Sequence, residues 1–152
     1  GEGDSTPDLT WNTLFREPMV IVPSGLKQFR FGRGKSPSVF TIEPHSSTWG
    51  YLDRRIRLYA DSWGTTIEVE QTLQYFSCII QVARHGFGHG LVPLELALAV
   101  GISRDCLIEF PDPGLFRPIS LVGRSTTFAR PLMKSFHQQL TRGLSNILPE
   151  IT

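Results

Sequence analysis

Two clusters of small polar residues are the best candidates for binding chemistry in this chain. Ser46, Ser47 and Thr48 follow a short apolar run and precede an amphipathic stretch, and Gln71 and Thr72 hold the equivalent place one unit later. Hydroxyl groups at a helix start can cap the helix by accepting hydrogen bonds from its free N–H groups. Together with those N–H groups they can also bind a carboxylate or phosphate, helped by the helix dipole. The clusters therefore predict helix caps, a site for a small polar or carboxylate-bearing ligand, or both. Aromatic residues near the clusters could equally line an aromatic pocket.

The residues that could support catalysis do not form a catalytic pattern. His45 stands beside Ser46, but adjacent residues rarely place a base and a nucleophile correctly, and no G-x-S-x-G motif is present. The run GRGK at 32–35 lacks the spacing of a phosphate-binding loop. Glu43 and Glu70 are the acids or bases available near the two clusters, and their interpretation as solvated or cap-supporting carboxylates is favoured. We therefore expect no enzyme activity, no catalytic residue and no cofactor.

The histidines do not predict a metal site. His85 and His89 have the four-residue spacing that places two ligands on one face of a helix, but Gly86 and Gly88 interrupt any helix between them. No carboxylate or thiolate stands nearby at ligand spacing. The run GFGHG at 86–90 also differs from a dinucleotide fingerprint, which opens a helix after a strand, whereas this run follows a helix. Its glycines are expected to serve a tight turn and close packing.

Strands and helices alternate along the chain, which predicts an α/β fold with a mainly parallel sheet. The expected strands are residues 14–22, 39–42, 65–69, 89–92, 107–110 and 119–122, and the expected helices are residues 49–63, 72–84, 93–100 and 129–144. The first helix carries an amphipathic stripe at Leu52, Ile56, Tyr59 and Trp63. Gly64 is expected to end that helix.

Composition restricts the class of protein. The chain has 152 residues, of which 40% are hydrophobic and 19% charged, as in globular proteins with a buried core. A net charge of +1 gives this chain no electrostatic case for binding nucleic acid. Its two cysteines do not make a disulfide framework and favour a reducing compartment, and Cys78 in the run FSCII is expected to pack as a small hydrophobe.

The start of the sequence and its apolar runs bear on location. The sequence shows no signal peptide and no apolar run long enough to span a bilayer, so we expect a cytoplasmic protein without membrane contact. It also begins without methionine, and we take it as a fragment of a longer chain.

The order of the motifs resembles the effector-binding domain of LysR-type transcriptional regulators. The resemblance rests on LFREPMVIVPS, VFTIEPHSSTW, IEVEQTLQYFSCIIQVARHGFGHGLVPLELA and RPISLVGRSTTFARPLMKSFHQQL, which together extend over almost the whole chain. Its most specific part is GFGHGLVP, which matches the family pattern G-x-G-x-x-L-[LV]-P. The resemblance implies a periplasmic-binding-protein-like fold, in which two α/β lobes are joined by two crossing segments and a small effector is bound in the cleft.

The resemblance also implies a division of the chain. Residues 39–110 would form a complete second lobe, and residues 1–24 and 117–152 would be parts of an incomplete first lobe. Residues 25–38 would be one crossing segment and residues 111–116 the return hinge.

The family's second-lobe ligand contacts fall on the two polar clusters, that is on Ser46, Ser47, Thr48, Gln71 and Thr72. The implied partners are a small-molecule effector, further copies of the chain in a homodimer or tetramer, and DNA. DNA would be bound only through a helix-turn-helix domain that this sequence does not contain. A periplasmic-type solute-binding protein is the main alternative, and an enzyme on the same scaffold, similar to cyclohexadienyl dehydratase, is a further one.

Overall fold

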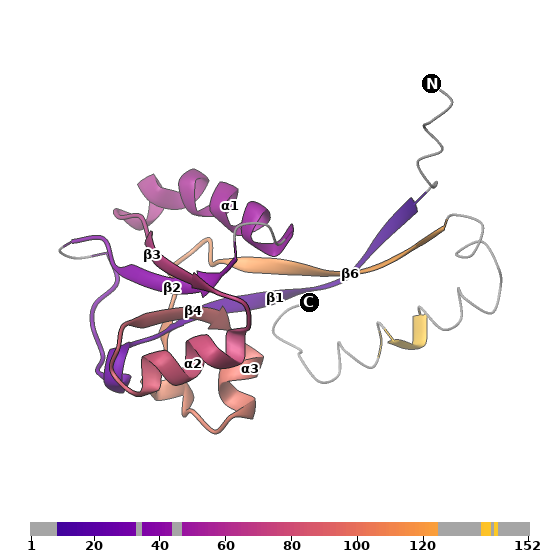
Figure 1. The fold of residues 1–152 in the computed structure, drawn as a ribbon. Coiled ribbons are helices and arrows are strands. Elements are labelled where there is room, and N and C mark those ends of the chain that lie inside the picture. Colours follow the sequence, from indigo (N-terminus) through magenta and orange to yellow (C-terminus); the bar gives the residue numbers. More distant parts are fainter. Residues whose placement is uncertain (1–8, 33–34, 44–46, 125–137, 141, 143–152) are drawn as a thin grey trace. The chain divides into compact units, whose positions relative to one another are not determined.

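The computed structural model describes residues 9–32, 35–43, 47–124, 138–140 and 142 (Figure 1). Its strands are β1 (Leu9–Val22), β2 (Ser38–Ile42), β3 (Glu68–Leu73), β4 (His89–Pro93), β5 (Ile108–Glu109) and β6 (Phe116–Arg124). Its helices are α1 (Ser47–Trp63), α2 (Phe76–Arg84) and α3 (Leu94–Ala99), with two short 3-10 turns, η2 (Ser24–Leu26) and η3 (Arg104–Cys106). Of the helix expected at 129–144, only residues 138–140 and 142 are described, and these are helical. None of the helices described is both long and apolar enough to cross a membrane.

Contacts between residues divide the chain into two units. The larger unit is Glu17–Arg117, and the smaller one combines Gly1–Arg16 with Pro118–Thr152. The boundaries fall inside β1 and β6, which pair with each other. All the site geometry described below belongs to the larger unit.

The larger unit contains a mixed sheet with the strand order β3-β2-β4-β1-β5. β2 runs parallel to β3 and to β4, whereas β1 runs antiparallel to both β4 and β5. It follows that β2, β3, β4 and β5 share one direction and that β1 alone among these five strands opposes them. The expectation of a mainly parallel sheet therefore holds except at β1, which lies between β4 and β5 and runs antiparallel to both.

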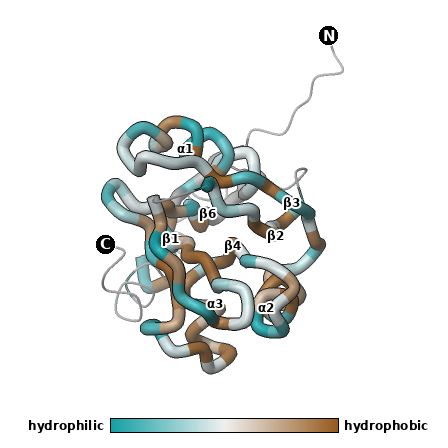
Figure 2. The backbone as a smooth tube through the Cα atoms, turned by 90° about the vertical axis from the view of Figure 1, so that its left-hand side faces the viewer, coloured by the Kyte–Doolittle hydropathy of each residue, from teal (hydrophilic) through white to brown (hydrophobic). Residues whose placement is uncertain are grey.

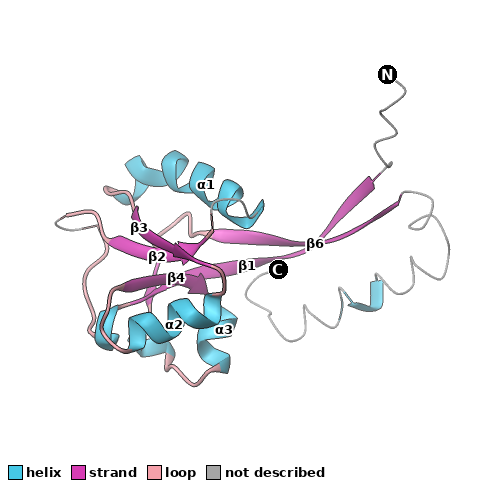
Figure 3. Cartoon of the chain, in the orientation of Figure 1, coloured by secondary structure: helices cyan, strands magenta, loops and turns pink. Residues whose placement is uncertain are grey.

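The sheet is covered by helices on both faces. α1 lies over one face, and α2 and α3 lie over the other (Figures 1 and 3). A strand buried on both faces is hydrophobic along its length instead of alternating. The end of β1 shows this pattern, because Met19, Val20, Ile21 and Val22 are all at most 2% exposed. Figure 2 shows hydrophobic stretches of β1 and β4 between the two helical layers.

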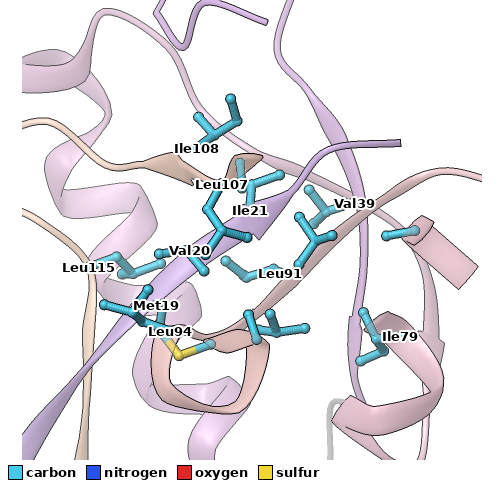
Figure 4. Packing of buried hydrophobic residues seen from close by; sticks show 14 of the residues in the cluster. Met19, Val20, Ile21, Val39, Ile79, Leu91, Leu94, Leu107, Ile108 and Leu115 are labelled. Atoms are coloured by element: carbon cyan, nitrogen blue, oxygen red, sulfur yellow. The ribbon is translucent and has the colours of Figure 1, made fainter. Parts of the chain in front are cut away.

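The core forms where β1, β4 and the helices meet. Figure 4 shows Met19, Val20 and Ile21 of β1 among Leu91, Leu94 and Leu115, and the backbone N–H of Met19 donates to the carbonyl of Leu115 over 2.8 Å. On the other face, the stripe predicted for α1 is confirmed. Leu52, Ile56 and Trp63 are buried, Tyr59 packs against them in part, and Gly64 with φ +72° follows the last helical residue.

The glycine run after α2 serves turning and packing, as predicted. Gly86 has φ +83°, and its N–H donates to Ala83 while the N–H of Phe87 donates to Val82, which is a Schellman motif. Gly90 on β4 lies against α2, where a Cβ atom would stand 2.8 Å from Cγ2 of Ile79. The run GFGHG at 86–90 therefore allows the chain to turn after α2 and β4 to pack closely against that helix.

Three local expectations were wrong. α2 begins at Phe76 instead of Thr72, and the strand before it extends over Glu68–Leu73 instead of residues 65–69. Cys78 is exposed, because the buried face of α2 consists of Phe76, Ile79, Ile80 and Ala83. In each case strand pairing or helix phase decided the outcome, and neither is visible in a short apolar run.

Candidate functional site

The carboxyl ends of three parallel strands meet at one edge of the sheet in the larger unit. Ile42 at the end of β2 lies opposite Leu73 at the end of β3, and Phe40 lies opposite Gly90 of β4. Each of these strands is followed by a helix that begins within a few residues. In open α/β sheets ligands are bound outside the carboxyl ends of the strands, so this edge is the candidate site.

The first polar cluster lies at the corner between β2 and α1. Ser47 and Thr48 are in the first turn of α1, and Ser46 lies outside the described residues. The backbone N–H groups of a first helical turn have no partner within the helix, and the positive end of the helix dipole lies there. This corner can therefore present N–H donors to an anion or to a polar group.

The second polar cluster lies in a strand instead of at a helix start. Gln71 and Thr72 belong to β3, where they pair with Phe40 and Thr41 of β2. Gln71 is exposed and Thr72 is half-buried. The predicted cap at Thr72 was therefore wrong: the N-cap of α2 is Tyr75, which makes no side-chain capping bond. Thr72 still lies near the carboxyl end of β3, and its hydroxyl does not cap α2.

Sequence reasoning missed Thr41, which lies on β2 directly opposite Thr72. Thr41 is 0% exposed, and within the described residues its Oγ1 is a buried side-chain atom without a hydrogen-bond partner. Leaving a buried hydroxyl unpaired costs roughly 1–3 kcal/mol. Paired residues of neighbouring strands project from the same face, so the side chains of Thr41 and Thr72 lie beside each other near the ends of β2 and β3. The signal in the sequence was a polar residue inside the otherwise apolar strand VFTI.

The other acidic and histidine candidates belong to different elements of the fold. Glu43 is exposed just after β2, and Glu70 is exposed on β3. His85 is the C-cap residue of α2, whereas His89 begins β4 and its Nδ1 accepts the backbone N–H of Ser24 over 2.9 Å. The described residues contain no group of three or more histidine, cysteine or acidic side chains that could hold a metal ion.

Burial makes the stability of this fold sensitive to pH at His89. Desolvation lowers the pKa of His89 below its ordinary value of 6.5, and the negative charge of Glu70 opposes that change only in part. The unfolded chain therefore binds more protons than the folded chain as the pH falls below about 6.5. The free energy of unfolding should accordingly decrease as the pH drops from about 6.5 towards the lowered pKa of His89.

We expect His89→Asn to reduce this loss of stability between pH 7.5 and pH 5.0, measured by urea unfolding of both proteins. The matched control is His85→Asn, which removes a histidine from the exposed end of α2 and should retain the pH dependence of the original chain. Equal losses in the His89→Asn and original proteins would contradict the assignment.

Comparison with solved structures identifies the fold. CbnR, a LysR family transcriptional regulator, matches 88% of this chain with a TM-score of 0.59 and 14% identity, and the match spans 48% of the CbnR chain. An OxyR2 regulatory domain from Vibrio vulnificus matches 90% of this chain with a TM-score of 0.62 and 18% identity, over 65% of its own length. The effector binding domain of QuiR in complex with shikimate matches 91% with a TM-score of 0.57 and 17% identity, over 66% of its own length.

No protein-family model and no curated protein matches the sequence. The chain spans less than two thirds of the CbnR and OxyR2 structures, so the comparison concerns the part that it covers. Over that part the resemblance read from the sequence motifs is confirmed at the level of the fold. The chain has the periplasmic-binding-protein-like α/β fold of the effector-binding domains of LysR-family transcriptional regulators.

Proposed function

We propose that this chain is the ligand-sensing part of a bacterial LysR-type transcriptional regulator. The observation that carries the proposal is the fold, shared over about 90% of the chain with regulatory domains, of which the QuiR domain was solved with shikimate bound. A small-molecule effector would be bound in the interlobe cleft, with Ser46, Ser47 and Thr48 at one corner and Gln71 and Thr72 on β3. Thr41 adds a buried hydroxyl beside Thr72.

The chemistry of the edge favours a small polar or carboxylate-bearing effector. A carboxylate can accept hydrogen bonds from the first-turn N–H groups of α1 and from threonine hydroxyls. Such an acceptor would also satisfy Thr41 Oγ1, which no described residue pairs, once the side chains that now cover it move aside. Hydrogen bonds alone would hold such an effector, without proton transfer or a covalent step. The proposed role is therefore binding and not catalysis.

We also propose how the chain is divided into lobes and which partners the full-length regulator binds. Residues 39–110 would form the second lobe, residues 1–24 and 117–152 would contribute to the first, and residues 25–38 and 111–116 would connect them. The full-length regulator would work in the cytoplasm as a homodimer or tetramer, and it would contact DNA through a separate helix-turn-helix domain. Effector binding would act on DNA binding by favouring one arrangement of these parts through differential contacts.

Substitution of the proposed contact residues tests the function. We expect Ser47→Ala combined with Thr72→Ala, in the full-length protein, to raise the inducer concentration for a half-maximal response about tenfold or more, because hydrogen bonds to a charged ligand are lost. Affinity for operator DNA without inducer should stay unchanged, since neither residue lies in a DNA-binding element. The measurement is an inducer dose–response curve together with DNA binding by fluorescence anisotropy.

The matched control is Ser62→Ala combined with Thr66→Ala, which makes the same two changes away from the carboxyl edge, at the end of α1 and before β3. This variant should respond as the original protein does. An unchanged dose–response curve for Ser47→Ala with Thr72→Ala would refute the role of this edge.

A further inference from the structure

A cavity lies at the opposite end of the parallel strands from the proposed effector site. It has a volume of about 310 Å³, and its lining includes Phe29, Arg30, Phe31, Lys35 and His89. His89 is the first residue of β4, and the other four belong to the segment that leads from β1 to β2. Because the effector contacts proposed above lie at the carboxyl ends of β2 and β3, this cavity is a separate feature of the larger unit. Its volume is at the lower end of the range for small-molecule sites.

The aromatic walls of the cavity are held in place by the core around them. Phe29 packs against the His89 ring at 4.7 Å between centroids, and the backbone N–H of Ser24 fixes His89 through its Nδ1. Phe31 makes edge contacts with Trp63 at 5.6 Å and with Phe110 at 5.1 Å. Walls that are fixed before binding lose little conformational freedom when a ligand enters.

The charge of the cavity is positive. Arg30 and Lys35 are both exposed, and neither forms an ion pair with another described residue. None of the residues that line the cavity is acidic. Since Nδ1 of His89 accepts a hydrogen bond, the neutral ring carries its proton on Nε2, which is a hydrogen-bond donor. The cavity thus combines aromatic faces with cationic and neutral donors. No acidic side chain lines it, and the nearby charge of Glu70 acts on the His89 ring.

We propose that this cavity is a second ligand site, which takes a small planar aromatic carboxylate. Aromatic rings stack or pack edge-on against one another at centroid distances of about 4.5–7 Å, so Phe29 and Phe31 can hold a flat ring. Arg30 and Lys35 can pair with the carboxylate at the rim of the cavity. A nonaromatic anion would use only the second of these features, and an uncharged aromatic molecule only the first.

The proposal can be tested on the 152-residue chain with benzoate as the probe, by calorimetry and by NMR. Benzoate should bind, and the amide signals of Phe29, Phe31 and His89 should shift with its concentration. Arg30→Gln combined with Lys35→Gln should weaken benzoate binding about tenfold or more. Lys27→Gln removes an exposed cation from the same segment but outside the cavity lining, and it should leave the affinity unchanged.

Two further ligands separate the contributions of ring and charge. Benzamide, which keeps the ring without the charge, and inorganic phosphate, which keeps charge without a ring, should each bind at least about tenfold more weakly than benzoate. Equal affinity for benzamide or for phosphate would overturn the proposal, and so would the absence of benzoate shifts at these residues. Benzoate shifts confined to the carboxyl ends of β2 and β3 would also overturn it while leaving the proposed sensing function standing.

Discussion

Replacing Gly90 by alanine is expected to lower the free energy of unfolding by about 2 kcal/mol. The added Cβ would stand 2.8 Å from Cγ2 and 3.3 Å from the backbone oxygen of Ile79, and 3.4 Å from Cβ of Ala83. Ile79 and Ala83 are both 0% exposed, so neither can move into solvent to make room. β4 and α2 would therefore have to separate. Urea unfolding of the original and substituted chains measures this loss.

Gly50 provides the matched control for that substitution. A Cβ atom at Gly50 would meet no atom within 4 Å, because this glycine is exposed on α1. Alanine favours the helix over glycine by about 1 kcal/mol, so Gly50→Ala should stabilise the chain where Gly90→Ala destabilises it. Equal effects of the two substitutions would contradict the conclusion that the GFGHG run is a packing motif.

Replacing Thr41 by valine is expected to raise the stability of the fold and to weaken effector binding. Valine has nearly the shape of threonine without the hydroxyl, and no described residue bonds to the Oγ1 of Thr41. Removing an unpaired buried hydroxyl should raise the free energy of unfolding by about 1 kcal/mol. Because we propose that this hydroxyl donates a hydrogen bond to the effector, the same substitution should also lower effector affinity about tenfold in the full-length protein. Urea unfolding and an effector dose–response curve supply the two measurements.

Thr65 is the matched control for Thr41. Its hydroxyl donates to the carbonyl of Thr66 over 3.3 Å and lies 3.4 Å from the Ser36 hydroxyl, so it has partners within the fold. Thr65→Val should therefore lower stability or leave it unchanged, and the effector response should be retained. A Thr41→Val protein that responds to effector as the original does would remove Thr41 from the proposed site.

The features best predicted from the sequence are those set by hydrophobic periodicity and by the backbone freedom of glycine. The stripe at Leu52, Ile56 and Trp63 is buried as expected, and Gly64 follows the helix with positive φ. The turn at Gly86 was likewise predictable, because a positive φ after a helix strongly favours glycine. These features depend on local backbone preferences that a single sequence displays.

The candidate site was predictable only in part. The carboxyl edge followed from the order of strands and helices, but the boundary between β3 and α2 did not. Thr72 can cap a helix, and pairing with Thr41 of β2 extended the strand through it instead. Thr41 stood out in the sequence only as a polar residue in the apolar run VFTI, and its unpaired hydroxyl emerges only when β2 is packed between its neighbours. Register and burial are tertiary properties, and they decide which polar side chains are left for a ligand.

The most direct test of the sensing function is a thermal-shift screen of the full-length protein against a panel of carboxylate-bearing metabolites. A ligand that binds the native state raises the melting temperature by mass action. We expect at least one compound to raise the melting temperature of the original and Thr65→Val proteins. The same compound should lose most of its effect on a protein carrying both Thr41→Val and Thr72→Ala. If no compound raises the melting temperature, or if every stabilising compound acts equally on all three proteins, the central claim is contradicted.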